Sequence, residues 1–124
     1  MQETIDEMPK AVECFVDGSA IGWYTYLYGD PSKADAVILE ANPDMTEEQL
    51  AFSREKLREY GIVDSGDTLE LGIGAMTDAR FKSFYGKMVE AGVLADGIDI
   101  SRAYTLGFVN KGVGLDLKKQ LTGQ

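Results

Sequence analysis

The sequence contains no histidine, and Cys14 is its only cysteine. Without histidine the chain lacks the commonest general base, the base of a Ser-His pair and the commonest transition-metal ligand. A single cysteine can form neither an internal disulfide nor a cysteine zinc cluster. Carboxylates remain available for Mg²⁺ or Ca²⁺, but no stretch matches an EF-hand loop. We therefore predict no enzyme activity, no catalytic residue, no metal site and no cofactor.

Basic residues and long apolar runs are also scarce. Twelve Lys and Arg stand against 21 Asp and Glu, which gives a net charge of −9. This balance argues against nucleic acid and anionic membranes as partners. The longest aromatic run, "AIGWYTYLY", is too short to span a bilayer. The acidic start, "MQETIDEMPK", has no basic or apolar region of a secretory signal. As written, the chain is expected to be soluble and cytoplasmic.

The sequence does contain helical periodicity, and its 124 residues fit one helical domain over 1–124. The strongest pattern runs from Pro9 to Tyr28, with Pro9 in the first turn and Gly29 as the stop. Gly18 and Gly22 inside it predict close approach by a neighbouring helix. The expected core face comprises Val12, Phe15, Val16, Ser19, Ala20, Trp23, Tyr24 and Leu27.

Three further capped patterns predict helices. The second spans 30–41, with Asp30 as N-cap and Pro31 in the first position. The third opens at Thr46 with the capping box "TEEQ" and ends at Gly61, and the fourth spans 77–91. Residues 62–76 are expected to form a loop. Residues 99–109 allow a short helix capped by Asp99 or a strand over 105–109, and 115–124 allow a frayed helical tail. The prediction is a mainly α fold of four or five amphipathic helices with little strand.

The stretch "LGIGAMTDARFKSF" raises the question of a phosphate-binding loop. The P-loop requires a lysine after the glycines, and the dinucleotide motif requires glycine where Thr77 stands. Asp78 would place a negative charge in the first helical turn, where a phosphate would bind. We therefore interpret Thr77 as an N-cap and Gly72 and Gly74 as residues that permit a tight turn.

Two other groups of residues are candidates for a ligand-binding or acid/base site. Tyr24, Tyr26, Tyr28 and Trp23 could form an aromatic ligand platform, but their helical spacing favours a core position for Trp23 and Tyr24, with Tyr26 pointing outward. The acids are interpreted as solvated surface groups rather than an acid/base pair; they are Asp64, Asp67, Glu70 and Asp78. "NKGVG", from Asn110, has the composition of a turn. The residues themselves identify no ligand-contacting position.

Several segments together resemble a known family. They are "FVDGSAIGWYTYLYGD", "NPDMTEEQ", "YGIVDSGD", "GIGAMTDARF", "MVEAG" and "AYTLGFVNKGVGLDL". Taken together in this order along the chain, these segments resemble the C-terminal part of ABC-transporter periplasmic substrate-binding proteins. The type is the one that includes nitrate/sulfonate/taurine and thiamine-pyrimidine-precursor binders. The resemblance implies the helical cover of one lobe of a type-2 periplasmic-binding (α/β) fold. The cleft-forming strands and the export signal would then lie upstream of Met1. The family's ligand-contacting residues lie largely in those segments, so none is transferred.

The resemblance implies that a longer parent protein captures a small organic or anionic solute in the periplasm and delivers it to an ABC permease. The alternative is a stand-alone helical interaction module without ligand capture. In either case, a helical layer separated from its sheet would expose apolar surface, which predicts a homodimer. A related branch contains thiamine-pyrimidine enzymes that depend on histidine, and this chain has none.

Overall fold

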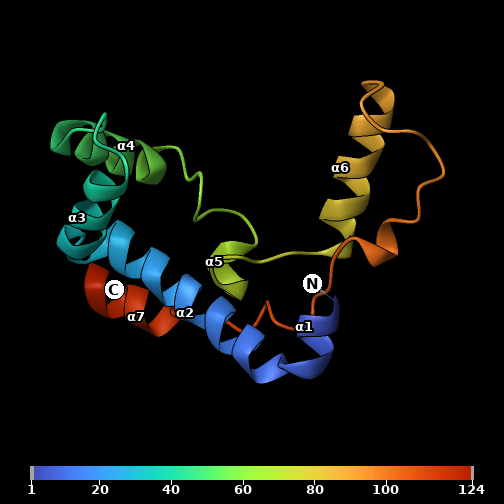
Figure 1. Ribbon diagram of the computed structural model, residues 1–124, viewed down its shortest axis with the longest axis horizontal. Helices are drawn as coiled ribbons and strands as arrows, with labels where there is room; N and C mark the ends of the chain where they lie inside the picture. The colour runs from blue at the N-terminus through green and yellow to red at the C-terminus, as the bar shows by residue number, and fades with distance from the viewer. Residues whose placement is uncertain (1, 124) are drawn as a thin grey trace.

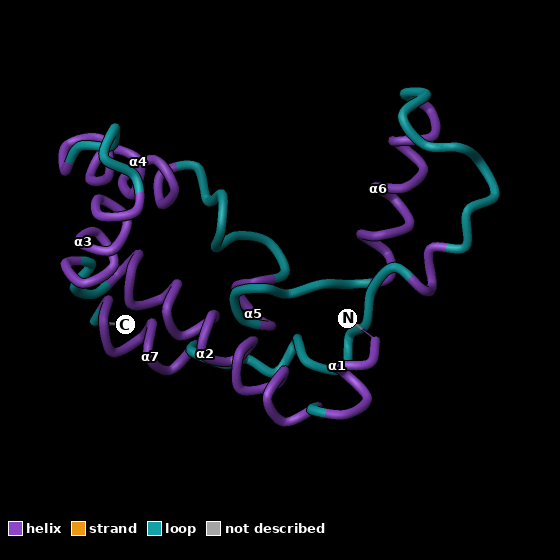
Figure 2. The backbone as a smooth tube through the Cα atoms, viewed as in Figure 1, coloured by secondary structure: helices purple, strands orange, loops and turns teal. Residues whose placement is uncertain are grey.

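In the computed structural model, residues 2–123 are described, and they fold almost entirely as helices joined by loops (Figure 1). No strand occurs among them (Figure 2), so the prediction of a mainly α fold is confirmed. The elements are α1 (Gln2–Glu7), α2 (Pro9–Tyr28), α3 (Ser32–Ala41), α4 (Glu47–Glu59), α5 (Thr68–Leu71), α6 (Asp78–Glu90), the 3₁₀ helix η1 (Ile100–Arg102) and α7 (Leu115–Thr122).

Helix α2 is the central element, and its predicted bounds are confirmed. Pro9 occupies the first turn, and the amide of Gly29 closes the last turn on the Thr25 carbonyl. The buried face of the helix holds Ala20, Tyr24 and Leu27, and α7 packs along α2. These three residues, with Leu50 of α4, are the buried apolar residues of the described chain.

The opposite face of α2 was predicted incorrectly. Phe15 is 76 % exposed and Trp23 is 40 % exposed, although periodicity placed both in the core. A Cβ added at Gly18 or Gly22 would meet no heavy atom within 4 Å, so no neighbouring helix approaches them. The reason is geometric, because α7, the main packing partner of α2, covers the side that holds Tyr24, and no element packs closely on Phe15, Gly18 or Gly22.

The second and third helices follow the predicted capping chemistry with one shift. Helix α3 begins at Ser32, one position later than expected, because Pro31 is its N-cap residue and Asp30 accepts a hydrogen bond from the Ser32 amide. The Thr46–Gln49 capping box is present in both directions. Gly61 follows α4 with φ +57°, as predicted for a left-handed cap.

Two elements near loops, α1 and α5, were not predicted from the sequence, whereas η1 and α7 form where a short helix was expected. Helix α1 forms in the polar N-terminal stretch, where no periodic pattern of apolar residues predicts a helix. The predicted loop 62–76 contains the single-turn helix α5. In the ambiguous segment, Asp99 caps η1 by accepting a hydrogen bond from the Ser101 amide, and 105–109 form no strand. The expected tail is an ordered helix, α7, packed on α2.

The chain divides into a helical body and a projecting arm (Figure 1). The body contains α2, α3, α4 and α7, whereas the arm contains α6, the turn that follows it, and η1. The main packing partner of α6 is η1, where the rings of Phe81 and Tyr104 stack with centroids 3.8 Å apart. The Tyr104 hydroxyl also donates a hydrogen bond to Asp78, at the start of α6.

The arrangement leaves a large surface. The accessible area is 8869 Å² for a 13.6 kDa chain, whereas a compact monomer of this mass exposes about 6,600 Å². Much of the additional surface carries apolar side chains; the most exposed are Phe15, Tyr60, Ile62, Val37 and Val93. The chain therefore buries less of itself than a globular protein of its size.

Candidate functional site

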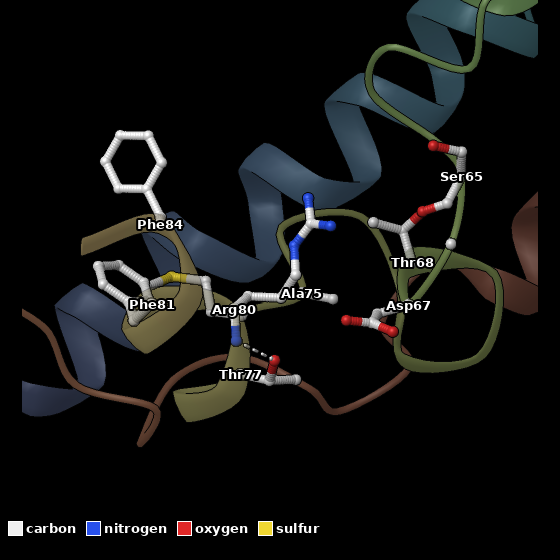
Figure 3. Close-up of a pocket in the computed structure, with 10 residues that line it drawn as sticks. Ser65, Asp67, Thr68, Ala75, Thr77, Arg80, Phe81 and Phe84 are labelled. Atoms are coloured by element: carbon white, nitrogen blue, oxygen red, sulfur yellow. Dashed lines mark hydrogen bonds between the residues drawn. The ribbon is translucent and has the colours of Figure 1, made fainter. Parts of the chain in front are cut away.

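A cleft lies where the arm leaves the body, between the loop before α5 and the first turns of α6 (Figure 3). Its volume is about 490 Å³, which falls in the range of small-molecule pockets. One wall comes from residues 65–68, the floor from 75–77, and the other wall from Arg80, Phe81 and Phe84. Phe84 is 59 % exposed, and the cleft opens to solvent. A solute in this cleft would contact the two walls and the floor and would stay exposed to solvent at the opening.

The glycine-rich stretch forms a turn that leads into the floor of the cleft. Gly72 has φ +90°, and a Cβ on it would lie 3.2 Å from the Val113 carbonyl oxygen. Thr77 accepts a hydrogen bond from the Arg80 amide, so its predicted role as N-cap is confirmed. Gly74 also has a left-handed conformation, with φ +88°. The glycines therefore form a tight turn beside residues 112–113, as expected.

Arg80 and Asp67 supply the charges of the cleft from opposite walls (Figure 3). None of the ion pairs between the described residues involves Arg80. The hydroxyls are used locally, since Ser65 donates to the Gly61 carbonyl and Thr68 to Asp64 and the Ser65 carbonyl. Arg80 is thus the group that could bind a carboxylate, sulfonate or phosphate, beside two phenylalanine rings.

Sequence analysis did not select Arg80. It stands at the third position of a predicted helix, where a cation has no special role in capping. The sequence does show Arg80 directly before Phe81 and four residues before Phe84. Only the fold brings residues 65–68 opposite these side chains to form a cleft. Asp67, considered only as a surface acid, lines the same cleft. Across residues 2–123, no three His, Cys, Asp or Glu side chains gather as a metal-binding group.

A second polar cluster is buried under the body and corrects the interpretation of Asp64. Asp64 is 8 % exposed rather than solvated. Its carboxylate lies 2.8 Å from the Lys118 ammonium and accepts hydrogen bonds from the Tyr28 hydroxyl at 2.7 Å and the Thr68 hydroxyl at 3.1 Å. The cluster joins α2, the loop before α5, and α7. Its groups are mutually satisfied, so its role is to hold these elements together.

The environment of the cluster shifts two pKa values in opposite directions. Burial works against ionisation of Asp64, but hydrogen bonds from Lys118 and Tyr28 outweigh it, and the pKa of Asp64 lies below its ordinary value. Burial, together with the hydrogen bond to Asp64, raises the pKa of Tyr28 to about 12. The folded chain therefore favours a charged carboxylate beside a neutral phenol.

This shift predicts a loss of stability at alkaline pH. Unfolded Tyr28 ionises near pH 10, whereas the folded phenol keeps its proton up to about pH 12. The unfolded state therefore binds fewer protons in this window, and the free energy of unfolding should fall as pH rises through it. Urea unfolding at a series of pH values above about 8 would measure the fall for the wild type and for Tyr28→Phe. The variant should lose stability less steeply, and identical slopes would contradict the assignment.

Two loops are joined beside this cluster by side chains that bind backbone. The Tyr24 hydroxyl accepts from the Ile73 amide at 3.1 Å. Asn110 accepts from the Met76 amide at 3.0 Å and donates to the Met76 carbonyl at 2.7 Å. The stretch "NKGVG" thus has a specific structural role beyond a turn. Asn110 itself has φ +62°, a conformation that asparagine tolerates better than most residues.

The four aromatic side chains do not form the ligand platform that the sequence analysis disfavoured. Tyr24 is buried, as predicted, and its ring stacks on that of Tyr28 at 6.4 Å between centroids. Trp23 contacts Tyr26 edge to face on the other side of α2. Tyr26 is half-buried rather than outward-pointing, with the Arg54 guanidinium 5.2 Å from its ring centroid. The four rings therefore form two separate pairs.

Comparison with protein-family models, with curated proteins and with solved structures found no match to this chain. Within the described range, no helix combines the length and the apolar character needed to cross a bilayer.

Proposed function

We propose that the chain is the helical part of a solute-binding protein of an ABC importer, in which it covers one lobe and supplies one wall of the solute cleft. The observation that carries this proposal is the surface area of 8869 Å², against about 6,600 Å² for a compact monomer of this mass. A layer that covers another part of a protein must expose the surface that the other part would bury. The resemblance of the sequence segments to such binding proteins supports this choice of larger protein.

The arm side of the molecule is the face that the remainder of the lobe would cover. Large apolar side chains are exposed on the arm and on the segment from the end of α4 through α5; they are Ile62, Leu69, Phe84, Val93, Leu94 and Ile98. Exposed apolar groups in such number mark an interaction surface rather than a free exterior. Phe84 also lines the 490 Å³ cleft, so a lobe that covered Phe84 would cover part of the open side of the cleft.

In this proposal the cleft holds a small solute with an anionic group, and the chain performs no chemical step on it. Arg80 would bind the anion, and Phe81 and Phe84 would contact the apolar part of the solute. The full binding protein would act in the periplasm and deliver its solute to an ABC permease. The chain alone offers half of the enclosure, and losing several kcal/mol of contacts weakens binding by a factor of ten for each ~1.4 kcal/mol.

The proposal is tested by thermal shift on two proteins. The first is this chain, and the second is the product of the longest reading frame that continues upstream of Met1. Taurine, alkanesulfonates, nitrate, bicarbonate and pyrimidine precursors should not raise the Tm of the first. At least one of them should raise the Tm of the second, and Arg80→Gln there should weaken binding at least about tenfold.

Two results would contradict the proposal. One is an upstream region that encodes no α/β lobe in frame with Met1. The other is stoichiometric binding of a solute by the chain alone with Kd below about 100 μM, roughly −5.5 kcal/mol. That affinity would mean that the cleft is complete without a second wall, and the chain would then be a receptor by itself.

A further inference from the structure

A second apolar cavity lies on the far side of α2, away from the cleft described above. It occupies the groove between α2 and α3 and has a volume of about 390 Å³. Ser19, Gly22, Trp23 and Tyr26 line it from α2, and Ala34 and Ile38 line it from α3. None of the side chains that form it is charged. No part of the described chain fills this groove.

The same helix carries a side chain that fits such a groove. Phe15 is 76 % exposed, the highest value among the exposed large apolar residues. Phe15, Gly18 and Gly22 follow one another at three- and four-residue spacing, so they lie along one stripe of the helix. The stripe therefore presents a protruding ring at one end, open space above Gly18 in the middle, and a hollow beside Gly22 at the other end.

We infer that this stripe is a two-fold interface with a second copy of the chain, in which two α2 helices pack antiparallel. A two-fold axis between Gly18 and Ser19 places residue 15 of one copy opposite residue 22 of the other. Phe15 of each copy then enters the groove beside Gly22, Trp23 and Ile38 of its partner. A self-complementary surface, with knob and hole on the same stripe, is what a closed two-fold dimer requires.

Charge and area both favour a second copy as the occupant. Two chains that each carry −9 repel one another, so a contact between them is favoured where no charged side chains meet, and the lining of this groove has none. The nearby carboxylates of α2, Glu13 and Asp17, lie toward the opposite side and are paired with Lys111 at 3.0 and 2.6 Å. A standard interface buries about 800 Å² per partner. The additional area of this chain exceeds that amount, so a dimer leaves surface for the proposed lobe.

The inference goes beyond the proposed function and does not depend on it, because the groove lies apart from the cleft and the arm. Light scattering coupled to size exclusion should give twice the 13.6 kDa chain mass at high concentration, without any solute. Phe15→Glu should raise the dimer dissociation constant at least about tenfold. Phe84→Glu is the matched control, since Phe84 is also an exposed aromatic residue on a helix but lies on the arm. It should leave the dissociation constant unchanged.

A glycine pair separates association from folding. Gly22 and Gly86 both lie inside helices with no heavy atom within 4 Å of an added Cβ. Leucine at either position should therefore raise the Tm of the monomer, because glycine is a poor helix former. Only Gly22→Leu should weaken the dimer, because its side chain fills the groove that receives Phe15. This readout remains valid if Phe15→Glu changes the fold.

Cysteine cross-linking tests the antiparallel arrangement. In a Cys14→Ser background, Ser19→Cys should form a disulfide-linked dimer on oxidation, whereas Ser83→Cys on the arm should not. The two wild-type Cys14 residues would lie about 13 Å apart along the helices, too far to be bridged. The unmodified chain should therefore give no disulfide dimer.

Three results would overturn the inference. The first is a monomeric mass at concentrations up to about 200 μM, well above the Kd of a typical specific complex. The second is an equal increase of the dimer dissociation constant in Phe15→Glu and Phe84→Glu. The third is a disulfide-linked dimer through wild-type Cys14. The last result would indicate parallel helices.

Discussion

Gly114→Ala is expected to destabilise the chain by several kcal/mol. Gly114 precedes α7 with φ +85°, and a Cβ there would lie 2.3 and 2.7 Å from two carbon atoms of the Tyr24 ring. Tyr24 is completely buried, so its ring has no free space into which to move. The substitution must shift either the ring or the start of α7, and overpacking of this kind adds about 1–3 kcal/mol to the cost of the left-handed conformation.

Gly74→Ala supplies the matched control for this experiment. Gly74 has φ +88°, close to the φ of Gly114, but an added Cβ would meet nothing within 4 Å. It should therefore show only the backbone penalty of about 1–2 kcal/mol. Urea unfolding at one fixed protein concentration would compare both variants, because any self-association makes the apparent stability depend on concentration. Equal losses in the two variants would mean that the Tyr24 contact carries no energy.

Lys118→Met is expected to have the second large effect, about 3 kcal/mol. The substitution removes the cation 2.8 Å from Asp64, whose side chain is only 2 % exposed. Breaking a buried ion pair by removing one partner leaves an uncompensated buried charge. Tyr28 and Thr68 would still donate hydrogen bonds to Asp64 and would limit the loss. Urea unfolding at neutral pH would measure the change.

Lys119→Met is the control in the adjacent position. Lys119 is 65 % exposed and pairs with Asp116, which is 91 % exposed, at 3.4 Å. Surface pairs of this kind contribute little, so the control should change the free energy of unfolding by less than about 0.5 kcal/mol. In Asp64→Asn together with Lys118→Met, the buried charge is gone, and part of the stability should return. A double variant no more stable than Lys118→Met would contradict the buried-charge argument.

The helix caps were predictable from the sequence, whereas the Asp64 cluster was not. Helix bounds were predictable because caps are local: Thr46 bonds Gln49, and Thr77 bonds the Arg80 amide, each three residues away. The Asp64 cluster joins residues 36 and 54 positions from Asp64, and no local pattern reports that distance. Asp64 therefore had the same appearance in sequence as any surface acid.

The core face of α2 shows a different limit. The periodic pattern correctly identified a helix with an apolar face, but it could not state which apolar residues meet a neighbour. Tyr24 and Leu27 are buried on the face of α2 that packs against neighbouring elements, whereas Phe15 is left exposed and Trp23 is covered only in part. The cleft is another case, since it depends on the placement of the 65–68 loop opposite α6. Helical periodicity indicates which side chains tend to be buried. Whether a given side chain is buried depends on which element packs against it.

The joined loops at the base of the arm have a consequence for the way the chain unfolds. Met76 and Asn110 are held together by two hydrogen bonds, and the Gly112 amide donates to the Leu71 carbonyl at 2.9 Å. Residues 77–109 therefore start and end at one place on the body, and α6 meets mainly η1 within that segment. The arm can open while the α2–α7 core keeps its contacts, so the protein should contain two cooperative units. Amides of α6 should exchange with solvent through this smaller opening, and those of α2 only when the whole chain unfolds.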